Sequence, residues 1–102
     1  MRKAEVSMHG VKAGVLEEIE KEKKYIFTYD DEYTGDPISL TMPLQNKRYE
    51  FDLFPPVFEG LLPEGIQLEG LLRINKIDAH DFFSQLVSVG GDMVGAVTVK
   101  EV

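Results

Sequence analysis

The side chains best suited to acid–base catalysis in this sequence are its two histidines, His9 and His80. A serine or threonine becomes an effective nucleophile only beside such a base. His9 stands in a predicted hairpin turn and His80 in the first turn of a predicted helix, so each has an ordinary structural explanation. Cysteine is absent from the sequence, which excludes disulfides, thiolate zinc sites and cysteine nucleophiles. We therefore expect no catalytic residue and no enzymatic activity.

An acidic loop at residues 30–36 is the best candidate for a metal site. An EF-hand loop that begins at Asp30 would draw oxygen ligands from Glu32 and Thr34 and would use Gly35 for its sharp turn. Its twelfth position must supply a bidentate glutamate. That position is Thr41, which has no carboxylate. We therefore expect a solvated loop, with no metal ion and no cofactor.

Two short motifs resemble parts of nucleotide-binding proteins. Glycines are concentrated in residues 90–95, but a phosphate loop follows a strand, opens a helix and usually carries a lysine. Here the glycines follow a predicted helix and open a strand. Asp81 and Phe82 resemble the start of a kinase metal-binding motif, but Phe83 replaces its glycine. We interpret the glycines as a helix stop and the aromatic residues as core.

With 102 residues, the chain has the length of one domain, and we expect residues 1–102 to form a single domain. Eleven basic residues against eighteen acidic ones give a formal net charge of −7. That charge repels phosphate backbones, so nucleic acid is not an expected direct ligand. No apolar run approaches the roughly 18 residues of a membrane span, and no apolar stretch follows the basic start at Arg2 and Lys3. The expected location is the cytoplasm.

The first half of the chain is predicted to form strands. Alternating apolar residues at 5–8 and 11–15 flank a glycine and indicate a tight hairpin. Residues 17–24 carry mixed charges and are predicted to form a solvated turn or a hairpin tip. A third strand covers residues 25–29, where aromatic side chains recur at every second position. Residues 38–42 favour a fourth strand, short or at an edge because a proline follows it.

The second half is predicted to form helices and one last strand. A Pro-Pro pair opens a short helix at residues 57–62, and apolar spacing predicts a second at residues 66–74, weakened by Gly70. Asp78 is the predicted N-cap of a third helix, and residues 93–99 form the last strand. The third helix is expected to bury Phe82, Phe83, Leu86 and Val87. This order predicts an α+β domain, in which two or three short helices cap a small antiparallel sheet of about five short strands, open or barrel-like.

Residues 58–66 combine apolar, turn-forming and acidic residues in a short stretch. One interpretation is a helix–turn–helix joint that packs on the sheet. The other is a partner-contact point, because an apolar residue that follows a Pro-x-Gly turn at a helix start is readily left exposed and can anchor an interface. On that interpretation the predicted partner-binding residues are Ile66, Glu64, Glu59 and Phe58, with Ile66 as the first.

Three stretches of this sequence resemble the N-terminal subdomain of HipA-type kinases, the Ser/Thr kinase toxins of bacterial toxin–antitoxin loci. They are residues 38–44 (ISLTMPL), 58–65 (FEGLLPEG) and 91–97 (GDMVGAV), and the opening hairpin at residues 6–16 is also similar to that family. In the two-component family a kinase core several times longer follows this subdomain in the same polypeptide. Here the sequence stops at Val102, so it resembles the free-standing, HipS-like form of three-component loci.

The resemblance implies a non-catalytic antitoxin that binds a HipA-like Ser/Thr kinase in trans and neutralises it. An acidic surface would complement a basic, phosphate-binding kinase cleft and speed the encounter. The alternative is an assembly subdomain of a split kinase toxin, which supports folding or contact with a helix-turn-helix partner without inhibiting the kinase. The family relation permits contact with that HipB-like helix-turn-helix protein, although no residue here specifies it. Neither function calls for a cofactor or a membrane.

Overall fold

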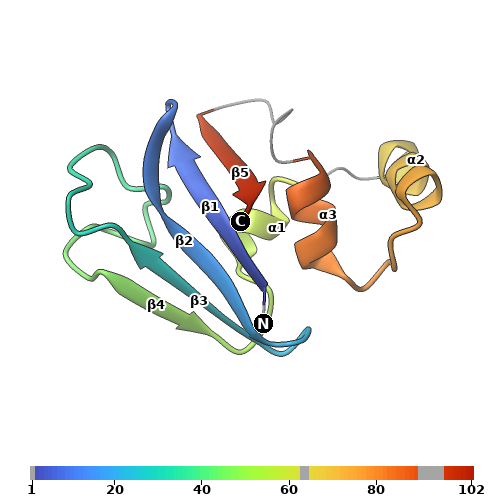
Figure 1. Cartoon of the computed structure of the whole chain (residues 1–102), viewed down its shortest axis with the longest axis horizontal. Helices are drawn as coiled ribbons and strands as arrows, with labels where there is room; N and C mark the ends of the chain where they lie inside the picture. Colours follow the sequence, from blue (N-terminus) through green and yellow to red (C-terminus); the bar gives the residue numbers. More distant parts are fainter. Residues whose placement is uncertain (1, 63–64, 90–95) are drawn as a thin grey trace.

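The computed structural model of the chain describes residues 2–62, 65–89 and 96–102, which form a five-stranded antiparallel sheet and three helices (Figure 1). The strands are β1 (Arg2–Met8), β2 (Val11–Glu20), β3 (Lys24–Tyr29), β4 (Arg48–Phe51) and β5 (Val97–Glu101). The helices α1 (Pro56–Glu59), α2 (Gly65–Asn75) and α3 (Phe82–Val89) lie between β4 and β5 in the sequence. The predicted α+β class, with an antiparallel sheet, is confirmed.

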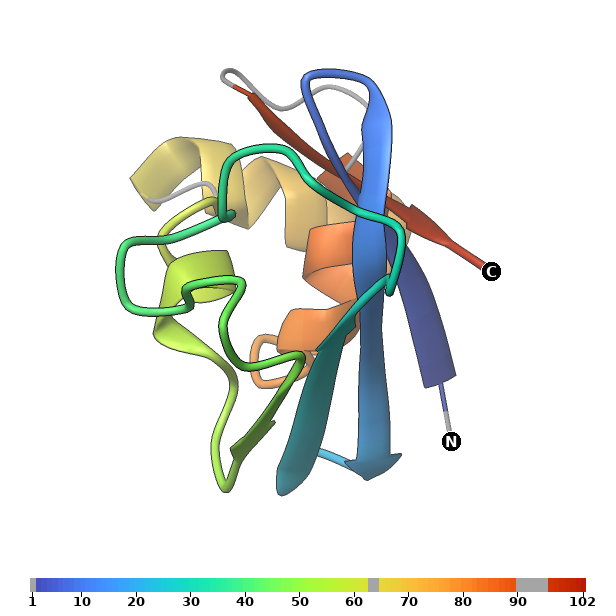
Figure 2. The same cartoon turned by 90° about the vertical axis from the view of Figure 1, so that its left-hand side faces the viewer.

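The sheet is open. Its strand order is β4-β3-β2-β1-β5, and within the described residues the edge strands β4 and β5 each pair with one neighbour only. The helices lie on one side of the sheet (Figure 2). The apolar face that a closed barrel would bury inside itself is therefore buried against α1 and α3. Of the two forms that the sequence left open, the barrel-like one is wrong.

Strand β2 is longer than expected. Residues 17–20, predicted as part of a solvated turn, continue the strand to Glu20, and the turn is confined to residues 21–23. Glu18 lies on the covered face with only 3% of its surface exposed. Its charge is tolerated there because Arg2 pairs with it, and that partner comes from another strand.

The fourth strand also lies elsewhere in the sequence. Residues 38–42 form a turn, and β4 takes the predicted strand's place beside β3. The hydroxyl of Tyr29 accepts a hydrogen bond from the backbone nitrogen of Ile38 (3.0 Å) and donates one to the backbone oxygen of Met42 (2.6 Å). These bonds satisfy backbone groups that a strand would have paired in a ladder.

The third helix begins later than its predicted cap. Helix α3 starts at Phe82, and the Oδ1 atom of Asp81 accepts a hydrogen bond from the backbone nitrogen of Ser84 at 3.2 Å, as an N-cap does. Asp78 instead accepts one from the backbone nitrogen of His80 at 2.8 Å, ahead of the helix. The prediction that Asp78 caps the helix is therefore wrong. Asp78 and Asp81 are both residues that commonly cap helices, and the structure uses Asp81.

The other predicted elements match more closely. The helices expected at residues 57–62 and 66–74 correspond to α1 and α2. The last strand is Val97–Glu101, shifted from the expected 93–99, because its pairing with β1 begins where Val97 faces Met8. Residues 93–95 and the expected helix stop at Gly90 and Gly91 lie outside the described residues.

Aromatic side chains dominate the core between the sheet and the helices. The ring centroid of Phe27 lies 4.9 Å from that of Tyr29 and 5.9 Å from that of Phe58 on α1. The predicted core positions Phe83 and Leu86 of α3 are fully buried. Phe82 and Val87 are partly buried against the same cluster. The core thus joins β1–β3 to α1 and α3, and these helices position the segments on which the candidate site lies.

Candidate functional site

Helix α1 is a single turn fastened to the sheet by Phe58. Pro55 precedes the helix in an extended conformation, and Pro56 occupies its first turn, where a missing N–H costs nothing. The backbone nitrogen of Phe58 donates to the oxygen of Pro55 at 3.0 Å. The Phe58 side chain is fully buried. Proline pre-organises the turn, and the buried ring anchors it.

The four predicted partner-binding residues lie on or near the junction of α1 and α2. Phe58 and Glu59 share the single turn of α1, where Glu59 is exposed and Phe58 is buried. The backbone of Ile66 belongs to the first turn of α2. Glu64 and the side chain of Ile66 lie outside the described part of the chain. The structure thus brings Phe58 and Glu59 together, and the binding role of all four residues stays a prediction.

Helix α2 projects from the end of the molecule, beyond α3 (Figure 1). Its side chain Ile74 is 80% exposed, and Leu68, Leu71 and Leu72 are only half-buried. Among the described residues, α2 packs less closely on the rest of the chain than α3 does on β5. Helix α2 therefore leaves apolar side chains uncovered by the rest of the described chain.

The link between α2 and α3 is held by hydrogen bonds. The backbone nitrogen of Ile77 donates to the oxygen of Leu72 at 3.1 Å. The amide Nε2 of the buried Gln85 donates to the backbone oxygens of Asp78 (3.2 Å) and Ala79 (3.1 Å). Because Gln85 lies on α3, these bonds fix the direction in which the chain arrives from α2.

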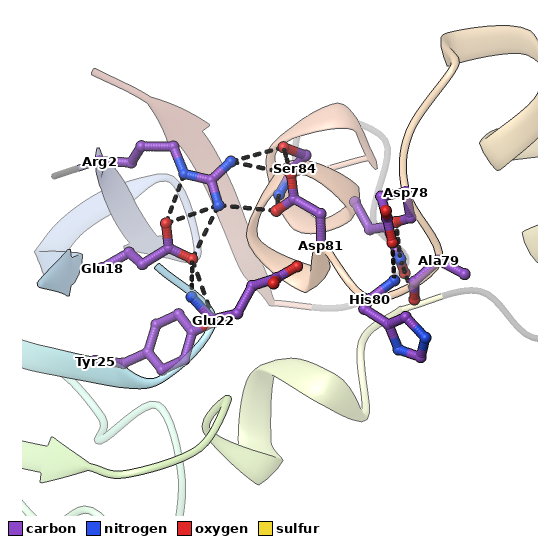
Figure 3. Close-up of polar contacts among 10 residues, drawn as sticks. Arg2, Glu18, Glu22, Tyr25, Asp78, Ala79, His80, Asp81 and Ser84 are labelled. Carbon is purple, nitrogen blue, oxygen red and sulfur yellow. Dashed lines mark hydrogen bonds and ion pairs between the residues drawn. The ribbon is translucent and has the colours of Figure 1, made fainter. Parts of the chain in front are cut away.

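Helix α3 is in turn clamped to the sheet by Arg2 (Figure 3). The guanidinium donates to Glu18 Oε1 from Nε (2.7 Å), to Asp81 Oδ1 (2.8 Å) and to Ser84 Oγ (2.7 Å). It also lies 4.8 Å from the ring centroid of Phe83, a cation–π distance. We call Arg2, Glu18, Asp81 and Ser84 the Arg2 clamp. The clamp joins β1, β2 and the N-terminus of α3.

The clamp changes the acidity of its members. Partial burial alone would raise the pKa of Asp81, but hydrogen bonds from Arg2 and Ser84 outweigh it and hold that pKa below its usual range. Burial alone would likewise lower the pKa of Arg2, but its bonds to Asp81 and Glu18 raise it. Burial, with the nearby charge of Glu18, raises the pKa of Tyr25. Its hydroxyl therefore stays protonated and donates to Glu18 Oε2 at 3.2 Å.

Sequence reasoning missed the clamp and the exposure of Ile74. Arg2 is 16 positions from Glu18 and 79 from Asp81, so no local pattern links them. Ile74 fitted the apolar spacing of a helix, but that spacing does not say whether another element covers the helix. The sequence did give one signal for α2, since Gly70 lowers the intrinsic helix propensity of this segment.

The candidate catalytic histidines and the candidate metal loop are not brought together with partner groups in the described part of the chain. His9 is an exposed turn residue with a φ of 52°, and His80 is exposed before α3. Within residues 2–62, 65–89 and 96–102, no three His, Asp or Glu side chains are placed to hold a metal ion. None of the described helices has the length and apolar character to cross a membrane.

Comparison with known proteins identifies the family. The family model of the HipA N-terminal domain matches residues 4–100. An uncharacterized protein of Haemophilus influenzae is 32% identical over 101 residues, which cover 99% of this chain and 93% of that protein. A solved structure of the N-terminal domain of HipA toxin aligns with all of this chain and 93% of its own, with a TM-score of 0.78 and 28% identity. The chain therefore belongs to the HipA N-terminal domain family.

Proposed function

We propose that this chain is a non-catalytic antitoxin, which binds a HipA-like Ser/Thr kinase as a separate protein and neutralises it in the cytoplasm. The observation that carries the proposal is the coverage of the Haemophilus influenzae relative. Because the match spans 93% of that relative, the relative contains little besides this domain. A domain that occurs both within a toxin and as a nearly separate protein can bind that toxin as a separate protein.

The contact surface in this proposal is the side of the molecule that carries α1 and α2, with α2 at the end beyond α3 (Figures 1 and 2). An interface of standard size takes roughly 800 Å² from each partner, about an eighth of the 6459 Å² surface of this chain. Glu59 on α1 and Ile74 on α2 are exposed, and the backbone of Ile66 belongs to the first turn of α2. Ile66 is the proposed anchor, and Glu59 and Glu64 are its proposed charged rim. Phe58, whose ring is buried, positions the turn that carries Glu59.

Inhibition then follows from geometry rather than chemistry. The kinase must bring ATP, metal ions and substrate into line. A protein bound across its active site, or bound so that the kinase lobes cannot close, prevents that alignment. The excess of carboxylates on this chain favours encounter with a phosphate-binding cleft.

The test is to identify a HipA-type kinase gene adjacent to the gene of this chain and to reconstitute the two purified proteins. The purified chain should bind the kinase and suppress ATP-dependent phosphorylation in proportion to its concentration, and co-expression should restore the growth of cells that make the kinase. The chain alone should release no phosphate from ATP and magnesium. A chain that binds but leaves toxicity intact or increases it would be an assembly subunit, and the antitoxin proposal would be wrong.

A matched pair of variants tests the contact surface. Ile66→Asp should weaken kinase binding by about tenfold or more, with the circular dichroism spectrum and melting temperature nearly unchanged. Val102→Asp introduces the same charge at a 78% exposed apolar position on the side of the sheet away from the helices (Figure 2), and should bind like the wild type. If Ile66→Asp unfolds the domain, Ile66 belongs to the core.

A further inference from the structure

The connection between β3 and β4 is long and yet ordered. Residues 30–47 contain no helix or strand, and connections of this length are usually either functional or disordered. This one is tied down by tyrosine hydroxyls. Tyr33 donates to the backbone oxygen of Asp36, and Tyr49 donates to that of Pro43 at 2.6 Å. Tyr29 bonds both ends of residues 38–42, so the connection is held in one shape.

The most exposed large apolar side chain in the described residues is displayed on this connection. Leu40 is 98% exposed, whereas its neighbours Ile38 and Met42 are buried to 7% and 2% exposure. Residues 39–42 form a tight turn in which the backbone nitrogen of Met42 donates to the oxygen of Ser39 at 3.0 Å. The hydroxyls of Ser39 and Thr41 bond to each other at 2.9 Å. Leu40 is thus the tip of a turn whose two ends are fixed in the core.

The connection that carries this turn is acidic, with four carboxylates in residues 30–36 against one lysine at Lys47. Asp31, Glu32 and Asp36 of the same connection are exposed, and none of them forms an ion pair with a described residue. Asp30 is paired with Lys12 at 3.8 Å. A second copy of this chain, with its own net charge of −7, is a poor electrostatic match for such a surface. A basic protein surface is a good one.

The position of the connection relates it to the proposed interface. In Figure 1 it lies at the end of the molecule opposite α2, along an axis of 39 Å. In Figure 2 it lies on the same side of the sheet as α1 and α2. A large partner that lies along that side therefore meets both ends. Two contact points on one rigid scaffold strengthen binding more than either alone.

We propose that the turn at residues 39–42 is a second contact point with the same kinase, and that Leu40 enters an apolar pocket ringed by Lys or Arg. This inference rests on the proposed function. Pre-organisation supports it, since a turn already fixed in its binding shape loses little entropy when it docks.

The experiment measures the affinity of the purified kinase for Leu40→Asp. We expect binding about tenfold weaker than for the wild type, with an unchanged circular dichroism spectrum and urea midpoint because the side chain is 98% exposed. Leu40→Met, which keeps an apolar side chain of similar volume, should bind within about twofold of the wild type. Val102→Asp is again the matched control. Replacing Asp31, Glu32 and Asp36 together by their amides should slow association at low salt and flatten its salt dependence.

The outcomes separate this inference from the proposed function. If Leu40→Asp binds like the wild type while Ile66→Asp is weakened, the second contact is wrong and the antitoxin proposal stands. If the wild-type chain does not bind the kinase, both fail. If the wild type forms a dimer that Leu40→Asp abolishes, residues 39–42 join two copies of this chain and the inference is overturned.

Discussion

The sheet with α3 and the projecting helix α2 differ in what holds them. The first region is joined by an aromatic core and by the Arg2 clamp, whose buried Glu18 has a charged partner. The second is an apolar helix with Ile74 80% exposed. The sheet with α3 contains most of the stabilising contacts, whereas α2 contributes mainly exposed apolar surface. Substitutions in the two regions should therefore affect folding very differently.

The largest expected effect comes from removing the anchor of α1. Phe58→Ala deletes a fully buried ring that packs on Phe27, and should lower the free energy of unfolding by about 4 kcal/mol. Urea unfolding followed by circular dichroism measures this. A loss below about 1 kcal/mol would mean that α1 does not belong to the stable region.

Breaking the clamp should cost somewhat less. Arg2→Met keeps an unbranched side chain but removes the guanidinium that lies over Phe83 and leaves Glu18 buried without its counter-ion. We expect a loss of about 3 kcal/mol. Lys3→Met removes a neighbouring charge whose only described ion pair, to Glu17 at 3.9 Å, is solvent-exposed, and should change stability by less than about 0.5 kcal/mol. Equal effects of the two variants would show that the clamp is not a stabilising feature.

Overpacking the sheet should have a moderate effect. A Cβ atom added at Gly14 would collide with the backbone oxygen of Thr28 and lie 2.9 Å from the ring of Phe27. Gly14→Ala should therefore destabilise the fold by about 2 kcal/mol. Thermal unfolding measures this, and an unchanged melting temperature would show that β2 and β3 separate easily to admit the methyl group.

The acid dependence of stability should reveal Asp81. Its folded-state pKa lies below the ordinary 3.8, so it contributes stability that is fully present above that value and is lost as the pH falls through the lower folded value. Asp81→Asn should be less stable than the wild type by about 1 kcal/mol at pH 7. The difference should persist to pH 5 and shrink below pH 4. A difference that is independent of pH would indicate a loss of packing instead.

The smallest effect has the opposite sign and lies in α2. Gly70 is helical and nothing lies within 4 Å of the position that its Cβ would take. Gly70→Ala should raise the free energy of unfolding by about 0.5 kcal/mol, through helix propensity alone. The gain should appear in hydrogen exchange confined to α2 if this helix opens independently of the sheet, and in global unfolding if it does not.

Local patterns predicted the elements whose causes are local. Alternation in the opening hairpin and the aromatic third strand placed β1–β3, and the Pro-Pro pair placed α1. Two of the failures, at residues 38–42 and at residues 17–20, have non-local causes. Residues 38–42 form a turn instead of the expected strand because the hydroxyl of Tyr29, on β3, hydrogen-bonds to the backbone of Ile38 and Met42. The turn expected from Glu17 is strand because Arg2 neutralises Glu18.

The candidate site shows the same limit. The composition of residues 58–66 drew attention to the junction of α1 and α2, and the structure confirms helices on both sides of it. Exposure could not be predicted, because it depends on which neighbour covers a side chain. The local pattern predicts a strand around Leu40 and a helix around Ile74, yet both are among the most exposed apolar side chains of the described residues.

The pairing of β1 with β5 determines when folding can be completed. Ala4 faces Glu101 across this pair. Strand β1 therefore cannot complete its pairing until β5 has been synthesised. The meander β1–β2–β3 is local and can assemble while synthesis continues. Until residue 101 has been made, one edge of β1 stays open and can pair with another nascent strand. Pairing with β5 therefore both completes the sheet and closes the edge of β1 at which association with another chain can begin.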